Sequence, residues 1–426
     1  MTTRTITGTV KAPDDTVYTG VALTFTLDEE IISSGVLVER YAVEITTETD
    51  GTFETALYVP DTGTALYHII LTNGEQYDFN FSIGAAVTLD EIISVAVTAS
   101  ESDYWLNLTS EYNVKSYGAI GNGIADDTAA IQAAIDAAAS TSGRVFIPAG
   151  YFIIKETINL PLQTSIVGHG HYTSILQAWG DFQGAMIKVT DTNYTGETYI
   201  HNIGLFGDNK AHTGIEYNHT GNSYLNPVRI QDCIDYGMLL NYGVWGIHAE
   251  NVNVGNCGNG LYATIANGQV NHNIFNKCKF LNSVGAGAKL NGGIVNRFMN
   301  CDFSYNGSGG VEEAGVLQIG GGQGLEVSGC YFETNGKVAL ENGVQIQIGD
   351  VNNTHHVPTI TKNYFYGGDG VNPGWCKSAI QLQNTLGAVI EGNRSSGHAD
   401  GSLVLLTENT SYRVGSNSFT ENIVGA

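Results

Sequence analysis

The chain of 426 residues is long enough for two domains, each with a substantial core. It holds 54 glycines but only 7 prolines, and this mixture favours many short strands joined by tight turns. The formal net charge of −24 argues against a nucleic-acid partner and against an anionic membrane as partner. The N-terminal segment MTTRTITGTV lacks the apolar region of a signal peptide, and no apolar run is long enough to span a membrane. We therefore expect a protein that is made in a cytoplasm and either stays there or leaves by lysis or assembly.

Residues 1–100 alternate apolar and polar side chains in short runs such as VALTFTL and TFETALYV. Turn signals such as Asn73-Gly74 separate these runs. Seven or eight strands at this spacing predict an antiparallel β-sandwich. The domain carries no catalytic constellation, and its acidic surface fits either a solvated face or a docking surface. Residues 101–112, ESDYWLNLTSEY, form the predicted linker.

Residues 113–160 combine a glycine-rich turn, an alanine-rich helix and the segment RVFIPAGYFII, which predicts two strands around a Pro-Gly turn. Asp126 and Asp127 stand at the start of the helix. Either aspartate is a natural N-cap, because a carboxylate accepts hydrogen bonds from free backbone N–H groups at the positive end of the helix dipole. We therefore interpret this acidic pair as structural and not catalytic.

The segment YGAIGNGIADDTAAIQAAI, followed by VFIPAG, resembles the signature of the pectate-lyase-like right-handed parallel β-helix superfamily. Many bacteriophage tailspikes open their β-helix with this unit, although the pattern more often has Asp where Asn122 stands. The resemblance implies a capping helix and first strands in residues 113–160 and a polysaccharide-binding parallel β-helix in residues 161–426. It also implies a virion location, attachment to a phage tail or adaptor protein through residues 1–100, and a homotrimer. Against a stable trimer, only NIVGA follows the last coil, with no trimerisation domain.

From about residue 200 the chain repeats, and equivalent apolar residues of successive coils are expected to stack as ladders. One column predicts the ladder Ile203, Cys233, Val252, Cys278, Cys301, Cys330, Asn363, Asn393 and Asn417. The columns three residues earlier and two residues later contain Ile230 and Asp235 in the coil of Cys233. We expect the four cysteines of the ladder to be buried, reduced thiols, and its asparagines to hydrogen-bond along the stack. No Cys/His spacing indicates a metal site, so no metal or other cofactor is predicted.

A later strand of each coil reads GVLQI, GVQIQI or SAIQLQ. Alternation predicts outward-facing amides in these strands, at Gln318, Gln345, Gln347, Gln381 and Gln383. A surface rich in amides, hydroxyls and tyrosines suits a polysaccharide, although every β-helix needs a polar exterior. Gln318 and Gln347 are our candidates for substrate binding from this group.

Asp302 and Glu333 are the candidate catalytic residues. Each follows a predicted inward residue, so both point outward from the same strand position of adjacent coils. One coil step plus two residues separates their backbones by roughly 8 Å. Inverting glycosidases place a general acid and a general base roughly 6.5–9.5 Å apart. Three tyrosines near the pair are candidates for stacking on sugar rings, namely Tyr305, Tyr331 and Tyr364.

A second outward column lies four residues before the ladder and includes Arg229, His248, Arg297 and Glu326. Arg297 and Glu326 occupy adjacent coils and form a predicted surface ion pair, which contributes little to stability. The alternative interpretation is that they bind an acidic sugar, and both are therefore candidate substrate-binding residues. Glu312 and Glu313 lie in a turn insertion and are alternative carboxylates.

Three functions remain open from the sequence. The first is a phage tailspike that binds and hydrolyses a bacterial surface polysaccharide. The second is an adhesive or structural tail fibre without activity, and the third is a pectinase-like hydrolase or lyase that is not attached to a virion. A polyuronate lyase would need an outward aspartate cluster for calcium, which the sequence does not show. The triplet Gly168-His169-Gly170 also occurs in polygalacturonases, but their accompanying motifs are missing here, so we interpret His169 as structural.

Overall fold

The computed structural model divides the chain into two compact units, Met1–Thr109 and Ser110–Ala426. In the first unit it describes residues 3–9, 22–27, 31–33, 36–38, 42–49, 52–60, 65–71, 76–81 and 87–88. In the second unit it describes residues 111–190, 197–264, 270–309, 314–336, 343–368, 376–405, 409–419 and 423–425. The described residues include no helix with the length and apolar character needed to span a bilayer.

The first unit is built from two main sheets with antiparallel pairing, as the alternating pattern predicts. One has the order β6-β1-β9 and the other β5-β2-β7-β8, and β3 pairs with β4. The exception to antiparallel pairing is β9, which runs parallel to β1. Rings of Phe25 and Phe53, one from each sheet, lie 6.0 Å apart and join the two layers. The strand bounds are β1 (Thr3–Thr9), β2 (Ala22–Leu27), β3 (Ile31–Ser33), β4 (Val36–Val38), β5 (Ala42–Thr46), β6 (Thr52–Tyr58), β7 (Ala65–Leu71), β8 (Gln76–Phe81) and β9 (Val87–Thr88).

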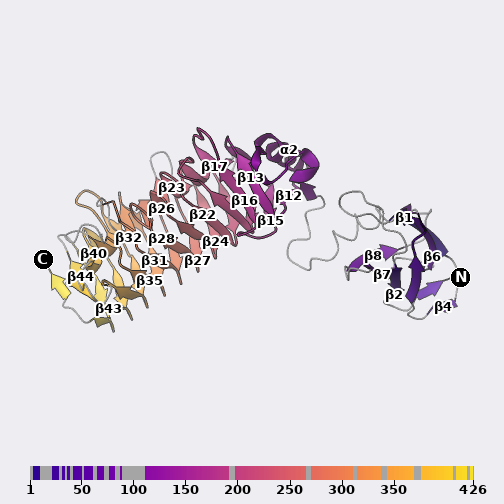
Figure 1. Ribbon diagram of the computed structural model, residues 1–426. Coiled ribbons are helices and arrows are strands. Elements are labelled where there is room, and N and C mark those ends of the chain that lie inside the picture. The colour runs from indigo at the N-terminus through magenta and orange to yellow at the C-terminus, as the bar shows by residue number, and fades with distance from the viewer. Residues whose placement is uncertain are drawn as a thin grey trace. The chain divides into compact units, whose positions relative to one another are not determined.

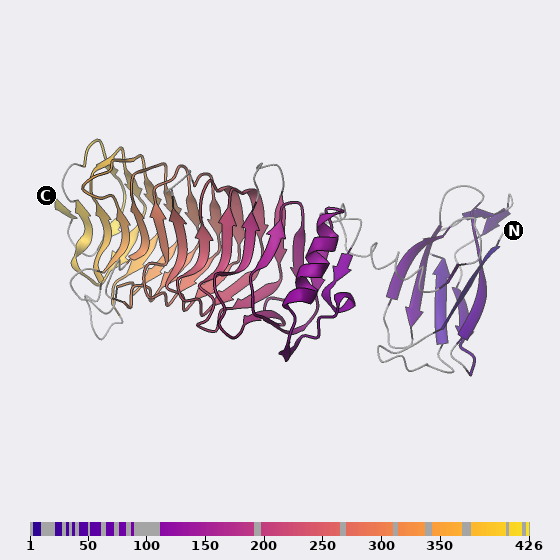
Figure 2. The same ribbon diagram turned by 90° about the horizontal axis from the view of Figure 1, so that it is seen from above.

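The second unit is a parallel β-helix whose coils each place one strand in three long sheets, here called A, B and C (Figures 1 and 2). Sheet A contains β10 (Glu111–Asn113), β12 (Arg144–Ile147), β15 (Ser165–Gly168), β18 (Thr198–His201), β21 (Gly221–Leu225), β24 (Trp245–Glu250), β27 (Ile274–Asn276), β30 (Arg297–Met299), β34 (Glu326–Ser328), β38 (Thr359–Thr361), β42 (Val389–Glu391) and β45 (Arg413–Val414). Its first strand includes Glu111 and Tyr112, which the sequence analysis assigns to the linker.

Sheet B contains β11 (Asn122–Asp126), β13 (Gly150–Ile154), β16 (Ser174–Ala178), β19 (Ile203–Phe206), β22 (Val228–Gln231), β25 (Asn253–Gly255), β28 (Lys279–Leu281), β31 (Asp302–Ser304), β35 (Tyr331–Glu333), β39 (Tyr364–Tyr366), β43 (Arg394–Ser396) and β46 (Ser418–Phe419). Sheet C contains β14 (Ile158–Pro161), β17 (Ala185–Thr190), β20 (Thr213–Asn218), β23 (Tyr236–Leu240), β26 (Asn259–Thr264), β29 (Ala288–Asn291), β32 (Ala314–Ile319), β36 (Val344–Ile348), β40 (Cys376–Leu382), β44 (His398–Leu405) and β47 (Ile423–Gly425). A short extra sheet is formed by β33 (Gly322–Gln323), β37 (His355–His356) and β41 (Thr385–Leu386).

Helix α2 (Thr128–Ala139) closes the N-terminal end of the β-helix, next to the short 3₁₀ helix η1 (Val114–Tyr117) (Figure 2). Its inward face consists of Ile131, Ala134, Ile135 and Ala138, all fully buried. This face covers apolar side chains of the first coil that would otherwise contact water, as a terminal cap of a repeat protein must.

The two aspartates at the start of α2 are structural, as predicted, but they bind different backbone groups. Asp126 Oδ1 accepts hydrogen bonds from the backbone N–H and the hydroxyl of Thr128, at 3.1 and 2.6 Å. Asp127 is buried, and its carboxylate instead accepts from the backbone N–H groups of Ile120 and Gly121, at 2.6 and 3.1 Å. Asp127 occupies the N-cap position, but its side chain fixes the glycine-rich turn and makes no bond to the helix. Asp126, one residue earlier, accepts from the first N–H of the helix instead.

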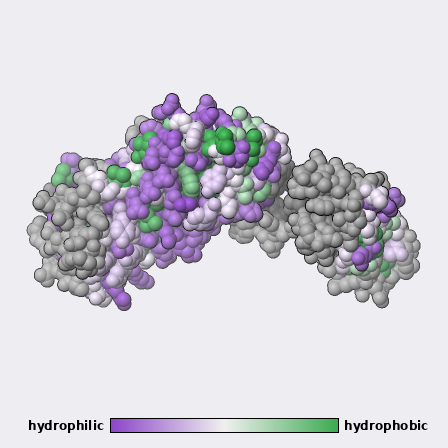
Figure 3. Space-filling view, viewed as in Figure 1, coloured by the Kyte–Doolittle hydropathy of each residue, from purple (hydrophilic) through white to green (hydrophobic). Residues whose placement is uncertain are grey.

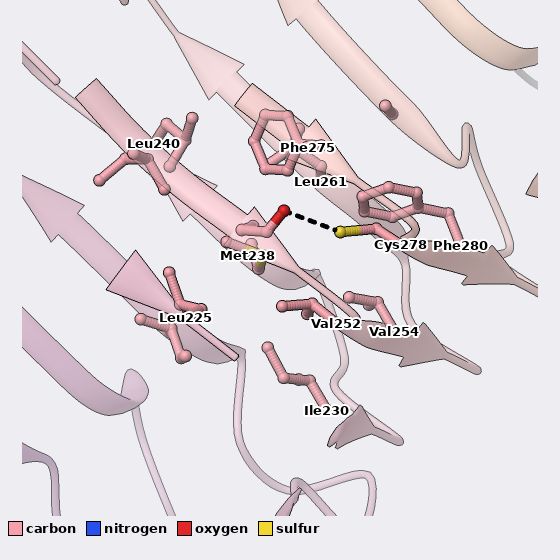
Figure 4. Close-up of a cluster of buried hydrophobic side chains, with 14 of the residues drawn as sticks. Leu225, Ile230, Met238, Leu240, Val252, Val254, Leu261, Phe275, Cys278 and Phe280 are labelled. Atoms are coloured by element: carbon pink, nitrogen blue, oxygen red, sulfur yellow. Dashed lines mark hydrogen bonds between the residues drawn. The ribbon is translucent and has the colours of Figure 1, made fainter. Parts of the chain in front are cut away.

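The interior ladders exist, but the predicted alignment is wrong in one coil. The register pairs Ile203 with Val228, and the neighbours of Val228 on either side align in the same way with the adjacent coils. In that coil the three ladder positions are Leu225, Val228 and Ile230, and not the predicted Ile230, Cys233 and Asp235. Figure 4 shows Leu225 and Ile230 in the same buried cluster as Val252 and Val254 of the next coil. The alignment thus slipped by five residues.

Cys233 belongs to a second ladder, at the corner between sheets B and C. It lies five residues after Val228, just as Cys257, Ser283, Asn306 and Asn335 follow the first ladder in later coils. All six cysteines are free and buried, which agrees with the prediction of reduced thiols. In Figure 4 the thiol of Cys278 donates a hydrogen bond to a carbonyl of the preceding coil, that of Ala249, at 3.3 Å.

Asparagines replace the cysteines in the later coils of the first ladder, and they bond along it as predicted. Asn363 Nδ2 donates to Asn393 Oδ1 at 3.0 Å and to the carbonyl of Val327 at 2.9 Å. Asn393 Nδ2 donates in turn to Asn417 Oδ1 at 3.0 Å. Each amide therefore satisfies a neighbouring amide and the backbone of an adjacent coil, which compensates for its burial.

Candidate functional site

The outer face of sheet B places the predicted catalytic residues next to each other. Lys279, Asp302, Tyr331 and Tyr364 form one register column across four successive strands. Glu333 lies one coil beyond Asp302, in register with Ser304. Inward-facing Phe303 and Phe332 separate the outward residues along each strand, so the strand alternation presents both carboxylates to solvent.

The two carboxylates are half-buried, and each accepts a hydrogen bond from a neutral hydroxyl. Ser304 Oγ donates to Asp302 Oδ1 at 2.5 Å. The hydroxyl of Tyr305 donates to Glu333 Oε1 at 3.1 Å. The offset of one coil and two residues agrees with the predicted backbone separation of roughly 8 Å.

Tyr331 lies between the two carboxylates. Burial, followed by the charges of Glu333 and Asp302, raises the pKa of its phenol. The two acids therefore converge on one phenol group, which stays protonated and remains a hydrogen-bond donor at neutral pH.

Aromatic rings beside the acids provide flat, open surfaces. The rings of Tyr331 and Tyr364 stack with their centroids 5.7 Å apart and their planes 10° from parallel. Tyr305, Tyr331 and Tyr364 are 44%, 37% and 45% exposed. Exposed aromatic rings with a polar edge are well suited to carry the apolar face of a sugar ring. The structure thus gathers five predicted site residues into one patch, here called the acidic face: Asp302, Tyr305, Tyr331, Glu333 and Tyr364.

Gln318 is not at the surface, and its prediction as a substrate-binding residue is wrong. It is 2% exposed and aligns with inward-facing Ile348. The segment AGVLQI is apolar on both faces, since Leu317 packs on the outer side with Ala286 and Ala314. Period-two alternation therefore gives no direction for this strand.

Gln345 is also buried, against prediction. Asn335 Nδ2 donates to its Oε1 at 2.5 Å, and its Nε2 donates to the carbonyl of Tyr366 at 2.9 Å. Gln347 is half-buried in sheet C. It therefore lies on a different sheet from the acidic face.

Arg297 and Glu326 form the predicted ion pair, with Nε and Oε2 3.3 Å apart. Both belong to sheet A, on the other side of the corner at Cys301, and so they do not join the acidic face. The slipped coil also misplaces Arg229, because Tyr224 and not Arg229 aligns with His248. Arg229 lies in sheet B, over the rings of Tyr172 and Phe206 at 4.9 and 4.8 Å.

His169 lies in the turn between β15 and β16, where its backbone N–H donates to the carbonyl of Ile147 and to Ser174 Oγ, at 3.2 and 2.8 Å. The adjacent Gly168 is required by packing, because a side chain there would lie 2.1 Å from the carbonyl oxygen of Asn202. Within the described part of the chain, no group of three His, Cys, Asp or Glu side chains is arranged to hold a metal ion. Glu312 and Glu313 lie outside the described residues.

The sequence analysis missed two features of the outer surface. Lys279 is exposed and directly in register with Asp302, so a cation flanks the acidic face. On sheet A, the rings of Tyr199, Tyr224 and His248 stack at 4.9 and 5.2 Å, and they lead toward exposed Trp245. A correct alignment of the coil at residues 221–231 would have placed Tyr224 between Tyr199 and His248. In the view of Figure 3 the surface of the β-helix is mainly hydrophilic, with scattered hydrophobic patches.

Comparison with known proteins places this architecture in a family. The family described as "Rhamnogalacturonase A/epimerase, pectate lyase-like" matches residues 112–403. The chain belongs to this family. The matched residues begin at the first strand of sheet A and include both carboxylates of the acidic face. The pectate-lyase-like β-helix that the sequence resembles is thereby confirmed.

Similar proteins include two kinds. The tail spike protein of Shigella phage Sf6 is 29% identical over 170 residues, which are 38% of this chain and 26% of that protein. The mannuronan C5-epimerase AlgE2 of Azotobacter vinelandii is 35% identical over 96 residues, 21% of this chain and 10% of the epimerase. The enzymatically active domain of tailspike protein 2 of bacteriophage CBA120 shares the fold, with a TM-score of 0.56 and 16% identity over 72% of this chain and 47% of that one. The matches cover only a small part of these curated relatives, 26% of the tail spike protein and 10% of the epimerase.

Proposed function

We propose that this protein is a phage tailspike that binds a bacterial surface polysaccharide and hydrolyses it at the acidic face. The observation that carries the proposal is the pair of half-buried carboxylates, Asp302 and Glu333, on either side of Tyr331 with its stacked neighbour Tyr364. Membership of a pectate-lyase-like family and likeness to phage tail spike proteins support the choice of ligand class.

The chemistry follows from the spacing. One carboxyl group, in its protonated form, donates its proton to the glycosidic oxygen as the bond to the sugar breaks. The other, as carboxylate, removes a proton from a water molecule that attacks the anomeric carbon from the opposite side, so the configuration inverts. Tyr331 and Tyr364 carry the sugar rings, and Tyr305 orients the Glu333 carboxylate through its hydrogen bond.

The direct test is the release of reducing ends from capsular polysaccharide or lipopolysaccharide of the host. The wild type releases oligosaccharides, and Asp302→Asn and Glu333→Gln each abolish the release. Unchanged release in both variants would refute the assignment of these residues. Binding without release on every host glycan would instead favour an adhesive tail protein.

The first unit and the quaternary structure complete the proposal. Residues 1–100 attach the β-helix to the phage tail or to an adaptor protein, and the assembled protein is a homotrimer on the virion. Deleting residues 1–105 is expected to leave a folded β-helix that no longer joins phage particles. Mass measurement in solution distinguishes a trimer from a monomer, and a monomer would remove the trimer from the proposal.

A further inference from the structure

A surface pocket on sheet A lies on the other side of the coil corner from the acidic face. Its volume is about 290 Å³, and it spans β24 and β27, which Figure 1 labels, and β30. The residues that matter for its chemistry are Trp245, His248, His272, Val295 and Arg297. We call it the corner pocket, because it lies at the bend before sheet A, which is a different bend from the one between sheets A and B.

Trp245 forms a flat apolar wall of this pocket. Gly221 is in register with Trp245, and a Cβ atom at Gly221 would lie 2.7 Å from the indole ring. The missing side chain lets the indole lie against the backbone of β21, and the ring is still 37% exposed. The stack of Tyr199, Tyr224 and His248 extends this apolar surface over three coils.

The polar groups of the pocket are cationic or neutral. Arg297 meets Glu326 through Nε, so its terminal nitrogens at the far edge of the guanidinium are geometrically able to donate to a ligand carboxylate. None of the described residues that line the pocket is acidic, in a chain with 42 Asp and Glu against 18 Lys and Arg. The lining thus offers one guanidinium and no carboxylate, because Glu326, which pairs with Arg297 Nε, is not among the lining residues. A ligand carboxylate would meet the terminal nitrogens of Arg297 as the charged group of the pocket.

The backbone of the pocket is strained at one point. Val295 has φ of 54°, whereas the equivalent corner positions of earlier coils are held by Asn222, Gly246 and His272. The left-handed region is unfavourable for a β-branched residue, and strain of this kind concentrates at ligand sites.

We propose that the corner pocket binds one acidic sugar unit of the polysaccharide, with its ring against Trp245 and its carboxylate on Arg297. This is a binding site separate from the acidic face, and it takes its ligand class, but not its location, from the proposed function. A bidentate contact between guanidinium and carboxylate gives the selectivity, and the indole gives affinity that is independent of charge.

A pair of matched probes tests this inference. The tetramer of β-1,4-linked glucuronic acid and cellotetraose differ only at C6 of each unit, which is a carboxylate in the first and a hydroxymethyl group in the second. Calorimetry measures the affinity of the full chain for each. We expect the acidic tetramer to bind at least tenfold more tightly. Arg297→Gln is expected to remove this difference, and Trp245→Ala to weaken the binding of both probes at least tenfold.

Control variants separate the site from general effects. Arg413→Gln removes an exposed arginine of the same column that pairs with Glu391, and it is expected to leave both affinities unchanged. Equal affinities for the two probes, no binding of either at millimolar concentration, or unchanged binding by Arg297→Gln would each overturn the corner pocket. Polysaccharide cleavage that depends on Asp302 would then still stand, whereas loss of cleavage with intact probe binding would refute only the proposed hydrolysis.

Discussion

The inner and outer sides of sheet B use the same strands in opposite ways. On the inner side Phe280, Phe303 and Phe332 stack with each ring centroid 5.0 Å from the next. On the outer side the neighbouring column changes from a lysine to an aspartate and then to two tyrosines. Neighbouring coils need interior side chains of similar size and polarity so that they can stack. The fold places no such requirement on the charge of the outward side chains. The repeated inward phenylalanines thus stabilise the stack of coils, whereas the varied outward residues are available for binding and catalysis.

The largest effect on activity is expected at the two carboxylates of the outer side. Asp302→Asn and Glu333→Gln are each expected to reduce polysaccharide cleavage by about 10²–10⁴-fold, the usual contribution of a general acid or base. Both side chains are outside the packed interior, so the thermal midpoint should move by a few degrees at most. Reducing-end assays and thermal melts on the same samples check both statements. Cleavage that falls in parallel with stability would mean that these acids support the fold.

The inner side should show the reverse. Phe303→Ala removes a fully buried ring between two stacked neighbours and is expected to lower the free energy of unfolding by about 3–5 kcal/mol. The matched outer variant is Tyr364→Ala on the same sheet, which should cost less than about 1 kcal/mol because its ring is 45% exposed. Urea unfolding measures both. Similar losses for the two variants would contradict the division between the sides.

The amide ladder predicts an intermediate effect. Asn393→Ala leaves the backbone N–H and the Nδ2 group of Asn363 without their acceptor, and both are buried. Two unsatisfied buried donors are expected to destabilise the fold by about 2–4 kcal/mol. Asn352→Ala, at an exposed position, is the control and should have little effect. A loss below about 1 kcal/mol for Asn393→Ala would show that water replaces the amide.

The thiols predict the smallest effect, and it depends on pH. Burial raises the pKa of the Cys301 and Cys330 thiols, so the folded protein keeps protons that the unfolded chain releases. Stability is therefore expected to fall as the pH rises above the ordinary thiol value of about 8.5. Urea midpoints between about pH 7 and pH 9.5 measure the slope, which Cys301→Ala should reduce. Ellman reagent should react only with the unfolded protein, and fast reaction of the native protein would contradict burial.

Sequence patterns were sufficient for the architecture, because the helix cap and most ladder positions depend on local residue types. The alignment failed where two positions in a coil require the same type of side chain. Cys233 and Val228 both occupy corners that require a small buried side chain, so a cysteine at the second corner was mistaken for one at the first. Gln318 failed for a related reason, since apolar residues on both faces of its strand conceal the direction of the amide. The carboxylate pair was predicted because its coils carry the clearest ladders. His248 and Arg297 of the corner pocket were also predicted to point outward, but its apolar wall, Trp245, lies outside the aligned columns and was missed.

The change from thiol to amide at the first corner also affects folding fidelity. A column of identical phenylalanines offers no means to tell one coil from the next, so a strand arriving one step out of place would still find rings to pack against. The backbone N–H of Cys330 donates to Asn363 Oδ1 at 2.8 Å, and from there onward every corner amide requires another amide as its successor. A displaced coil would set a thiol where an amide acceptor is needed, and the buried N–H would be left with the weaker acceptor that Cys330 Sγ offers to Cys301. The change from Cys330 to Asn363 thus marks one position in a repetitive sequence, and it helps the coils to assemble in the correct register.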